Sequence, residues 1–187
     1  MSKGLFITGP YRYRQDLCNG LLVKTLRQHG YDVGYYKAAI SGAPTVADSD
    51  AGFVNRTAAI GENSDLLLSY LYDHAVSPHL AARWEGAPLK RKSSSTTGKK
   101  VTARYPYVTV EGSGGIICPL RDDEQPFSSW KTSFIWLDLP SLIICPAGLG
   151  TIQRRVLTAF YMKAKQLPVQ VSIVNHLHRG SPNGKRQ

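Results

Sequence analysis

Three charged residues stand beside apolar runs and have the chemistry to act together. Lys37 ends an apolar run, Asp50 begins a helix-like segment, and Glu111 opens a glycine-rich run. Carboxylates are ligands that Mg²⁺ prefers, an ammonium neutralises anions, and glycines let backbone amides approach a ligand closely. Each residue also has an ordinary interpretation: a solvated lysine at a strand end, a helix cap, or the start of a turn. Taken singly, none of these residues decides between the functional and the ordinary interpretation.

The cysteine and histidine residues favour neither a disulfide framework nor a zinc site. Cys18, Cys118 and Cys145 lie far apart without a Cys-x-x-Cys pair, as expected for reduced thiols in a cytosolic protein. His176 and His178 stand near a strand end, but no third ligand accompanies them in the sequence.

Alternating strand and helix patterns must position these side chains. Short apolar runs predict strands at residues 4–8, 33–37, 107–110, 142–145 and 169–174. Apolar residues at helical spacing predict helices at 17–28, 48–60 and 152–165, and in the last helix Val156, Leu157, Phe160 and Tyr161 are expected on the inner side. Strands separated by helices imply an α/β fold with a mostly parallel sheet, helices on both faces, and ligands beyond the carboxyl ends of the strands.

Length and composition predict a single domain over residues 1–187. The 42% of hydrophobic residues is enough for a core, and 19% charged residues argues against bulk disorder. The sequence has no apolar run long enough to span a membrane and no signal peptide at its start, which favours a cytoplasmic protein. Residues 89–102 are basic and serine-rich without a period, so we expect a surface loop there. The formal net charge of +10 indicates nucleic-acid binding as one function to consider.

Several segments carry a family pattern in order along the chain. They are Gly-Leu-Phe-Ile-Thr-Gly at 4–9, Tyr-Tyr-Lys-Ala-Ala-Ile-Ser-Gly at 35–42, Asp-Ser-Asp-Ala at 48–51, Ser-Pro-His-Leu at 77–80 with Glu-Gly at 85–86, Val-Thr-Val-Glu-Gly-Ser-Gly-Gly at 108–115, Leu-Gly-Thr-Ile at 149–152 and Val-Asn at 174–175. Together they resemble the dethiobiotin synthetases, ATP-dependent enzymes of biotin synthesis. Their shared order is far more specific than any single match.

The resemblance implies a P-loop-type fold and cyclo-ligase chemistry. In that family one amine of 7,8-diaminopelargonate captures CO₂ as a carbamate, the carbamate attacks the γ-phosphoryl group of ATP, and the second amine closes a cyclic urea. By resemblance, Asp50 and Glu111 hold Mg²⁺. Lys37 stabilises negative charge on carbamate and phosphate, and Ser41 hydrogen-bonds the carbamate.

The same resemblance assigns the remaining site residues. Gly9 begins the phosphate-binding loop, and Asn175 lies where the family reads adenine. The glycine-rich run brings backbone amides close to cofactor and substrate; its members are Gly112, Ser113, Gly114 and Gly115. A helix start binds the substrate's carboxylate through Gly150, Thr151 and Ile152. Since the family forms homodimers with substrate near the subunit boundary, we expect residues 149–152 to lie close to a partner subunit.

The phosphate-binding loop departs from the family pattern, Gly-Thr-x-Thr-x-x-Gly-Lys-Thr. This chain has Gly-Pro-Tyr-Arg-Tyr-Arg-Gln-Asp-Leu at 9–17, so Asp16 replaces the phosphate-binding lysine and Leu17 the Mg²⁺-binding hydroxyl. A carboxylate there repels phosphate by about 1–4 kcal/mol at a separation of about 4 Å. Bulky side chains also replace the small residues that cradle phosphate. A catalytically impaired relative is therefore an alternative.

Single-base shifts of the reading frame offer an explanation. Residues 11–16, written as TAC-CGA-TAC-CGG-CAA-GAC and read one base later, give Thr-Asp-Thr-Gly-Lys-Thr, which completes a phosphate loop after Gly9 and Pro10. It is one residue shorter between its glycines than the family's usual loop. Comparable shifts at 130–134, 153–155 and 183–187 restore family-like or acidic residues. Most of the basic excess lies in these four windows, so the charge requires no nucleic-acid partner.

The sequence thus favours a cytoplasmic, homodimeric synthetase that uses ATP and Mg²⁺ on a diamine and CO₂, with neither a membrane nor a nucleic acid as partner. Two alternatives stay open: the impaired relative, and a basic nucleic-acid-binding protein. Because the family continues beyond the strand at 169–174, we expect a shortened C-terminus that lacks a last helix and strand.

Overall fold

The computed structural model describes residues 3–10, 14–120 and 139–176. Within them, parallel strands form one six-stranded sheet in the order β3-β2-β4-β1-β5-β6. The strands are β1 (Lys3–Thr8), β2 (Val33–Ser41), β3 (Leu68–Tyr72), β4 (Tyr107–Glu111), β5 (Ser141–Pro146) and β6 (Val169–Asn175). This arrangement confirms the predicted α/β fold built on a parallel sheet.

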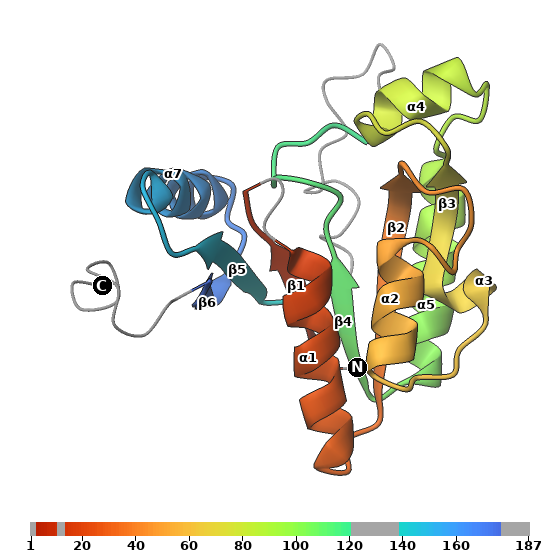
Figure 1. Ribbon diagram of the computed structural model, residues 1–187, viewed down its shortest axis with the longest axis horizontal. Helices are drawn as coiled ribbons and strands as arrows, with labels where there is room; N and C mark the ends of the chain where they lie inside the picture. The colour runs from red at the N-terminus through yellow and green to blue at the C-terminus, as the bar shows by residue number, and fades with distance from the viewer. Residues whose placement is uncertain (1–2, 11–13, 121–138, 177–187) are drawn as a thin grey trace.

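Helices cover both faces of the sheet, as predicted. They are α1 (Gln15–Gln28), α2 (Asp50–Thr57), α3 (Ser64–Leu67), α4 (Pro78–Trp84), α5 (Arg91–Arg104) and α7 (Thr151–Ala164). Figure 1 shows α1 and α2 in front of the sheet and α5 behind it. Neighbouring residues of β2 agree with this view, because Lys37 contacts Asp50 of α2 whereas Tyr36 donates to the carbonyl oxygen of Ser94 in α5 at 3.0 Å.

The register of the central strands sets which side chains can meet. Strand β2 pairs with β4 so that Lys37 lies opposite Glu111, and β4 pairs with β1 so that Glu111 lies opposite Ile7. Every residue of β2 except its last is buried, as is typical of a strand covered on both faces. Lys37 therefore carries its charge inside the protein and needs a partner there.

The predicted elements are present with shifted ends. Strand β2 continues beyond residue 37 to Ser41, and α2 begins at Asp50 rather than at residue 48. Strand β3 and helices α3 and α4 lie where no element is predicted. Residues 11–13, 130–134 and 183–187 of the frame-shift windows, together with His178, lie outside the described residues.

Residues 89–102 were expected to form a surface loop, and this expectation is wrong. Helix α5 occupies most of the segment. Its buried side is made of Ser94, Gly98, Val101 and then Tyr105, which recur at helical spacing. Serine and glycine do not form an apolar stripe in the sequence, but a small residue such as Ser94 lets the helix lie close to Tyr36.

The expected inner side of α7 is also wrong. Val156, Leu157 and Phe160 are 52%, 58% and 71% exposed. Of the four expected residues, Tyr161 alone packs partly buried against the core, beside the fully buried Met162. The helix therefore packs on the sheet through the face that carries Met162. Its other face exposes Val156, Leu157 and Phe160 to solvent. A contiguous apolar surface of this kind is typical of an interface.

The helices in the described residues were compared with the length and hydropathy of a membrane span. None of them is both long and apolar enough to cross a bilayer.

Candidate active site

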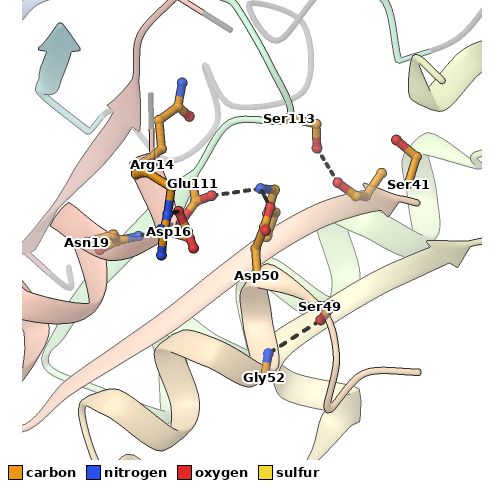
Figure 2. A network of polar contacts seen from close by, with 12 residues as sticks. Arg14, Asp16, Asn19, Ser41, Ser49, Asp50, Gly52, Glu111 and Ser113 are labelled. Carbon is orange, nitrogen blue, oxygen red and sulfur yellow. Dashed lines mark hydrogen bonds and ion pairs between the residues drawn. The ribbon is translucent and has the colours of Figure 1, made fainter. Parts of the chain in front are cut away.

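Three charged side chains meet where β4 ends. The Lys37 nitrogen Nζ lies 2.5 Å from Oδ2 of Asp50 and 2.6 Å from Oε1 of Glu111. Asp50 comes from the start of α2, so the cluster joins two neighbouring strands and a helix (Figure 2). The structure therefore brings these three residues, which the sequence places far apart, to one point.

Glu111 receives hydrogen bonds from several elements. Besides Lys37, the Asn19 amide nitrogen Nδ2 donates to Oε2 at 3.2 Å and the Tyr35 hydroxyl donates to it at 3.3 Å. These donors compensate for the burial of a carboxylate that is only 1% exposed. Burial raises the pKa of Glu111, and the Lys37 ammonium opposes that shift. Burial and the nearby Glu111 also raise the pKa of Tyr35, so its hydroxyl stays protonated and able to donate.

Lys37 stays positively charged despite its burial. Burial alone lowers the pKa of a lysine, but the Glu111 and Asp50 carboxylates outweigh that effect and raise the pKa of Lys37 above its ordinary value of 10.5. The site therefore contains an ammonium at every physiological pH.

Helix α2 presents Asp50 from its first turn. Ser49 caps the helix, since its Oγ accepts a hydrogen bond from the Gly52 amide at 3.3 Å. A Cβ on Gly52 would lie 2.2 Å from a backbone carbonyl oxygen of the preceding loop, so the loop can cross the helix closely only at glycine. The Asp50 side chain is 45% exposed. Its carboxylate is thus the part of the charged cluster that is open to solvent.

A cavity of about 730 Å³ opens beside the cluster. Its walls come from the end of β2, the loop before α4 and the glycine-rich loop after β4. Lining residues include Lys37, Ser41, Asp50, Ser113, Gly114 and Cys118. A cavity of this size suits a small organic ligand, and Lys37 and Asp50 connect it with the buried Glu111.

Two serines lie at the wall of the cavity near the end of β2 (Figure 2). The Ser41 hydroxyl donates to the carbonyl oxygen of Val76 at 2.6 Å, and the Ser113 hydroxyl donates to the carbonyl oxygen of Ala39. Each hydroxyl hydrogen is engaged by the backbone, so each oxygen retains a lone pair that can accept a bond from a ligand N–H group.

The glycine-rich loop lies between the cavity and the end of β1. The Gly112 amide donates to the carbonyl oxygen of Ile7 at 2.9 Å and is therefore engaged by the sheet. Gly114 adopts a φ of 78°, a left-handed conformation that favours glycine. A Cβ on Gly115 would lie 4.0 Å from the carbonyl oxygen of Gly9. Gly114 and Gly115 line the cavity, so this loop connects the cavity with Gly9.

Positions 15–17, the described residues at the start of α1, lack groups that a phosphate-binding loop supplies. The Gln15 amide nitrogen Nε2 donates to the carbonyl oxygen of Gly9 at 3.0 Å. Oδ1 of Asp16 lies 3.4 Å from Nε of Arg14, and Leu17 carries no hydroxyl. A triphosphate here would meet a carboxylate where it needs a cation. The residues present at positions 16 and 17 do not fit that group.

The residues assigned to the substrate carboxylate and to adenine lie elsewhere in the fold. Gly150, with a φ of 84°, precedes α7; Thr151 is buried and Ile152 is 73% exposed. Asn175 ends β6, and its buried amide nitrogen Nδ2 has no hydrogen-bond partner in the described part of the chain. Gly150, Thr151 and Ile152 follow β5, and Asn175 ends β6; β4 and β1 separate these two strands from β2. None of the four residues lines the cavity.

Asp50 and Glu111 form a donor set that suits Mg²⁺. Both supply hard carboxylate oxygens, and both already converge on one cation, the Lys37 ammonium. Across residues 3–10, 14–120 and 139–176, no group of three His, Cys, Asp or Glu side chains is placed to hold a metal. Two carboxylates match an ion that completes its coordination shell with phosphate oxygens and water.

Asn19 and Tyr35 belong to the site although no motif predicts them. Gln15 and Asn19 are buried on one face of α1, one helical turn apart and in line with the apolar Val23, so two polar residues on the apolar face are the signal that indicates them. Tyr35 precedes Lys37 by two residues in a strand and so shares its face.

Comparison with family models and characterised relatives gives a consistent result. A family model described as an AAA domain matches residues 18–184 and thus begins directly after the altered loop. ATP-dependent dethiobiotin synthetase BioD of Brachyspira hyodysenteriae is 42% identical over 176 residues, covering 94% of this chain and 80% of that protein. Proteins of the same name from Clostridium botulinum (strain Loch Maree) and Clostridium novyi are each 35% identical, covering 94% of this chain and 79% and 76% of their own lengths.

One solved structure supports the fold. The kinase domain of the Escherichia coli tyrosine kinase ETK superposes with a TM-score of 0.57 at 12% identity, covering 96% of this chain and 69% of that chain. The likeness at this identity concerns the arrangement of strands and helices alone.

Proposed function

The chain belongs to the ATP-dependent dethiobiotin synthetase family, ligases of biotin biosynthesis, and we propose that its cavity holds 7,8-diaminopelargonate and CO₂ beside Mg²⁺. The single observation that carries this proposal is the contact of Lys37 with Asp50 and with the buried Glu111, since Lys37 and Asp50 line the cavity. An ammonium and one carboxylate are therefore available at the wall of the cavity, and a second carboxylate lies directly behind them.

Lys37 and Ser41 act on the substrate in this proposal. When one amine of the diamine adds to CO₂ and loses a proton, the resulting carbamate is an anion, and the permanently charged Lys37 attracts it. Ser41 accepts a hydrogen bond from the carbamate N–H through the lone pair that its bond to Val76 leaves free. Both residues orient the carbamate oxygen as the acceptor of the phosphoryl group, and neither forms a covalent bond with it.

Asp50 and Glu111 are the proposed ligands of Mg²⁺. The ion supplies neutralisation of phosphate oxygens when it is bound. Asn19 and Tyr35 donate to Oε2 of Glu111 and so hold the carboxylate in one orientation. Gly114 and Gly115 supply backbone amides at the cavity wall for cofactor and substrate, and Gly112 holds their loop on the sheet.

Nucleotide use follows from the family, but the loop at positions 16 and 17 does not match it. Asp16 and Leu17 take no part in the proposed chemistry. We propose that the frame-shifted reading of residues 11–16 is the ancestral loop, in line with the family match that begins at residue 18. Asn175 is the proposed contact to adenine, since its buried Nδ2 donor has no partner among the described residues and suits a ring nitrogen.

We further propose that the protein is a cytoplasmic homodimer. Its three cysteines are free, which suits a reducing compartment. The exposed apolar side of α7 supports a second copy as the partner, with Gly150, Thr151 and Ile152 facing the substrate carboxylate of the neighbouring subunit.

Phosphate release that depends on the diamine and bicarbonate tests this function. Phosphate release is measured with Mg²⁺ and ATP for the protein with its present sequence, the chain as written, and for a variant with the restored loop. The restored variant carries Tyr11→Thr, Arg12→Asp, Tyr13→Thr, Arg14→Gly, Gln15→Lys and Asp16→Thr. We expect turnover from the restored variant and at least about 100-fold less from the chain as written, since a phosphate-loop lysine and a metal-binding hydroxyl are recovered together. Full activity of the chain as written would contradict our interpretation of Asp16.

Cys118 provides a binding readout that does not depend on turnover. It lines the cavity, and burial raises the pKa of its thiol, so alkylation is slow at neutral pH and measurable at alkaline pH. We expect the diamine to slow alkylation of Cys118 while leaving Cys18, which is outside the cavity lining, unchanged. Equal rates with and without the diamine would argue that the substrate does not occupy this cavity.

A further inference from the structure

The position of Lys37 has a consequence for the proposed metal site. Its ammonium lies between the two carboxylates that would hold Mg²⁺, at 2.5 Å from one and 2.6 Å from the other. Both ion pairs of Asp50 and Glu111 found in the described residues are with Lys37. The ammonium thus occupies the place that a divalent cation would take.

An ammonium and a divalent cation cannot share that place. The ammonium and the divalent cation would both bind the carboxylates of Asp50 and Glu111. Two positive charges at contact distance repel each other strongly where water is scarce. Lys37 is 5% exposed and Glu111 1% exposed, so little solvent screens the repulsion. Binding of the metal therefore requires the ammonium to move.

Lys37 has a place to move to. Its backbone is fixed in β2, but its side chain is a flexible four-carbon stem that also lines the cavity beside Ser41 and Ser113. An ammonium turned into that cavity loses its carboxylate partners and needs another anion. The carbamate of the substrate is an anion in the same cavity.

We propose that Lys37 occupies the cation position in the ligand-free protein and that a divalent cation displaces its ammonium into the cavity, where it meets the substrate anion. This proposal rests on the function proposed above. Metal and carbamate then assist each other's binding, because each stabilises the displaced position of Lys37. By linkage the assistance is equal in both directions.

Titration with Mn²⁺ alone, monitored by its electron paramagnetic resonance signal, tests without turnover whether Lys37 competes with a divalent cation. We expect Lys37→Met to bind Mn²⁺ at least about 10-fold more tightly than the wild type, since it removes the competing cation and keeps the aliphatic stem. Asp50→Asn should weaken binding in both backgrounds. Lys163→Met, at an exposed position of α7, is the matched control and should bind as the wild type does.

A second measurement uses the unmodified chain and is independent of whether Lys37→Met folds. We expect Mg²⁺ to raise acetylation of Lys37 by acetic anhydride at least about threefold, because the displaced amine enters the open cavity. Lys163 in the same sample should react at an unchanged rate.

The outcomes separate this inference from the function on which it rests. If Asp50→Asn weakens Mn²⁺ binding but Lys37→Met does not tighten it and acetylation stays constant, displacement of Lys37 is overturned and the metal site stands. If Asp50→Asn also has no effect, the proposed metal site itself is wrong, and the inference falls with it.

Discussion

Lys37 and Glu111 are register partners on the adjacent strands β2 and β4, and their side chains form an ion pair of 2.6 Å in the interior of the sheet. A parallel sheet normally fills such positions with apolar residues. At this position the protein therefore has a charged pair in place of apolar packing, and each charge depends on the other for compensation.

Removing one partner of this pair should be more harmful than removing both. We expect Lys37→Met to lower the free energy of unfolding by about 3–5 kcal/mol, because Glu111 is left as a buried charge without its ammonium. The double variant Lys37→Met/Glu111→Gln should recover at least half of that loss. Urea unfolding of the single and double variants measures the coupling. Strictly additive losses would show that the pair is not coupled.

Ser41 should contribute to substrate binding through its hydroxyl. In the restored-loop variant, we expect Ser41→Ala to reduce kcat/KM for the diamine by about 10-fold, as for loss of one hydrogen bond to a charged group. Ser41→Thr retains the hydroxyl and should recover most of the activity. Thr25→Ala is a matched control, since Thr25 also bonds a backbone carbonyl but lies exposed on α1. A loss as large in the control would point to a general structural effect.

Tyr105 should make the protein lose stability at alkaline pH. Burial, together with a 2.6 Å hydrogen bond to Glu62, raises the pKa of Tyr105 from its ordinary value of 10.0 to about 12. A raised pKa in the folded state stabilises the protein below pH 10.0, and this contribution is lost as the pH rises toward about 12. We expect Tyr105→Phe to show a smaller loss of unfolding free energy between these pH values. Parallel pH profiles for both proteins would exclude this role.

The exposed side of α7 should hold two copies together. Leu157 and Phe160 are 58% and 71% exposed, and burying such residues at an interface is favourable by about 25 cal/mol per Å². We expect Leu157→Glu/Phe160→Glu to shift the protein from dimer to monomer in sedimentation velocity. Leu21→Glu, at an exposed leucine on α1, should leave the distribution unchanged. A wild-type chain that sediments as a monomer at micromolar concentration would refute the dimer.

The sequence by itself determined the order of the strands' apolar runs, the α/β class and the family. Those features are local, because a few consecutive residues carry them. A buried strand is indicated by an apolar run, and a motif such as Glu-Gly-Ser-Gly-Gly consists of adjacent residues. Motif order also predicts that Lys37, Asp50 and Glu111 meet near the strand ends, whereas the direct ion pairs of Lys37 with both carboxylates come from the structure.

Only the tertiary structure decided which residues surround the charged cluster and which faces are covered. Asn19 meets Glu111 because α1 packs across the sheet, and α5 lies against β2, where Tyr36 bonds to Ser94. Phe160 faces solvent although its apolar spacing suggested the core. The physical reason is common to all three: packing between elements distant in sequence depends on shape and space at the contact, which local periodicity does not encode.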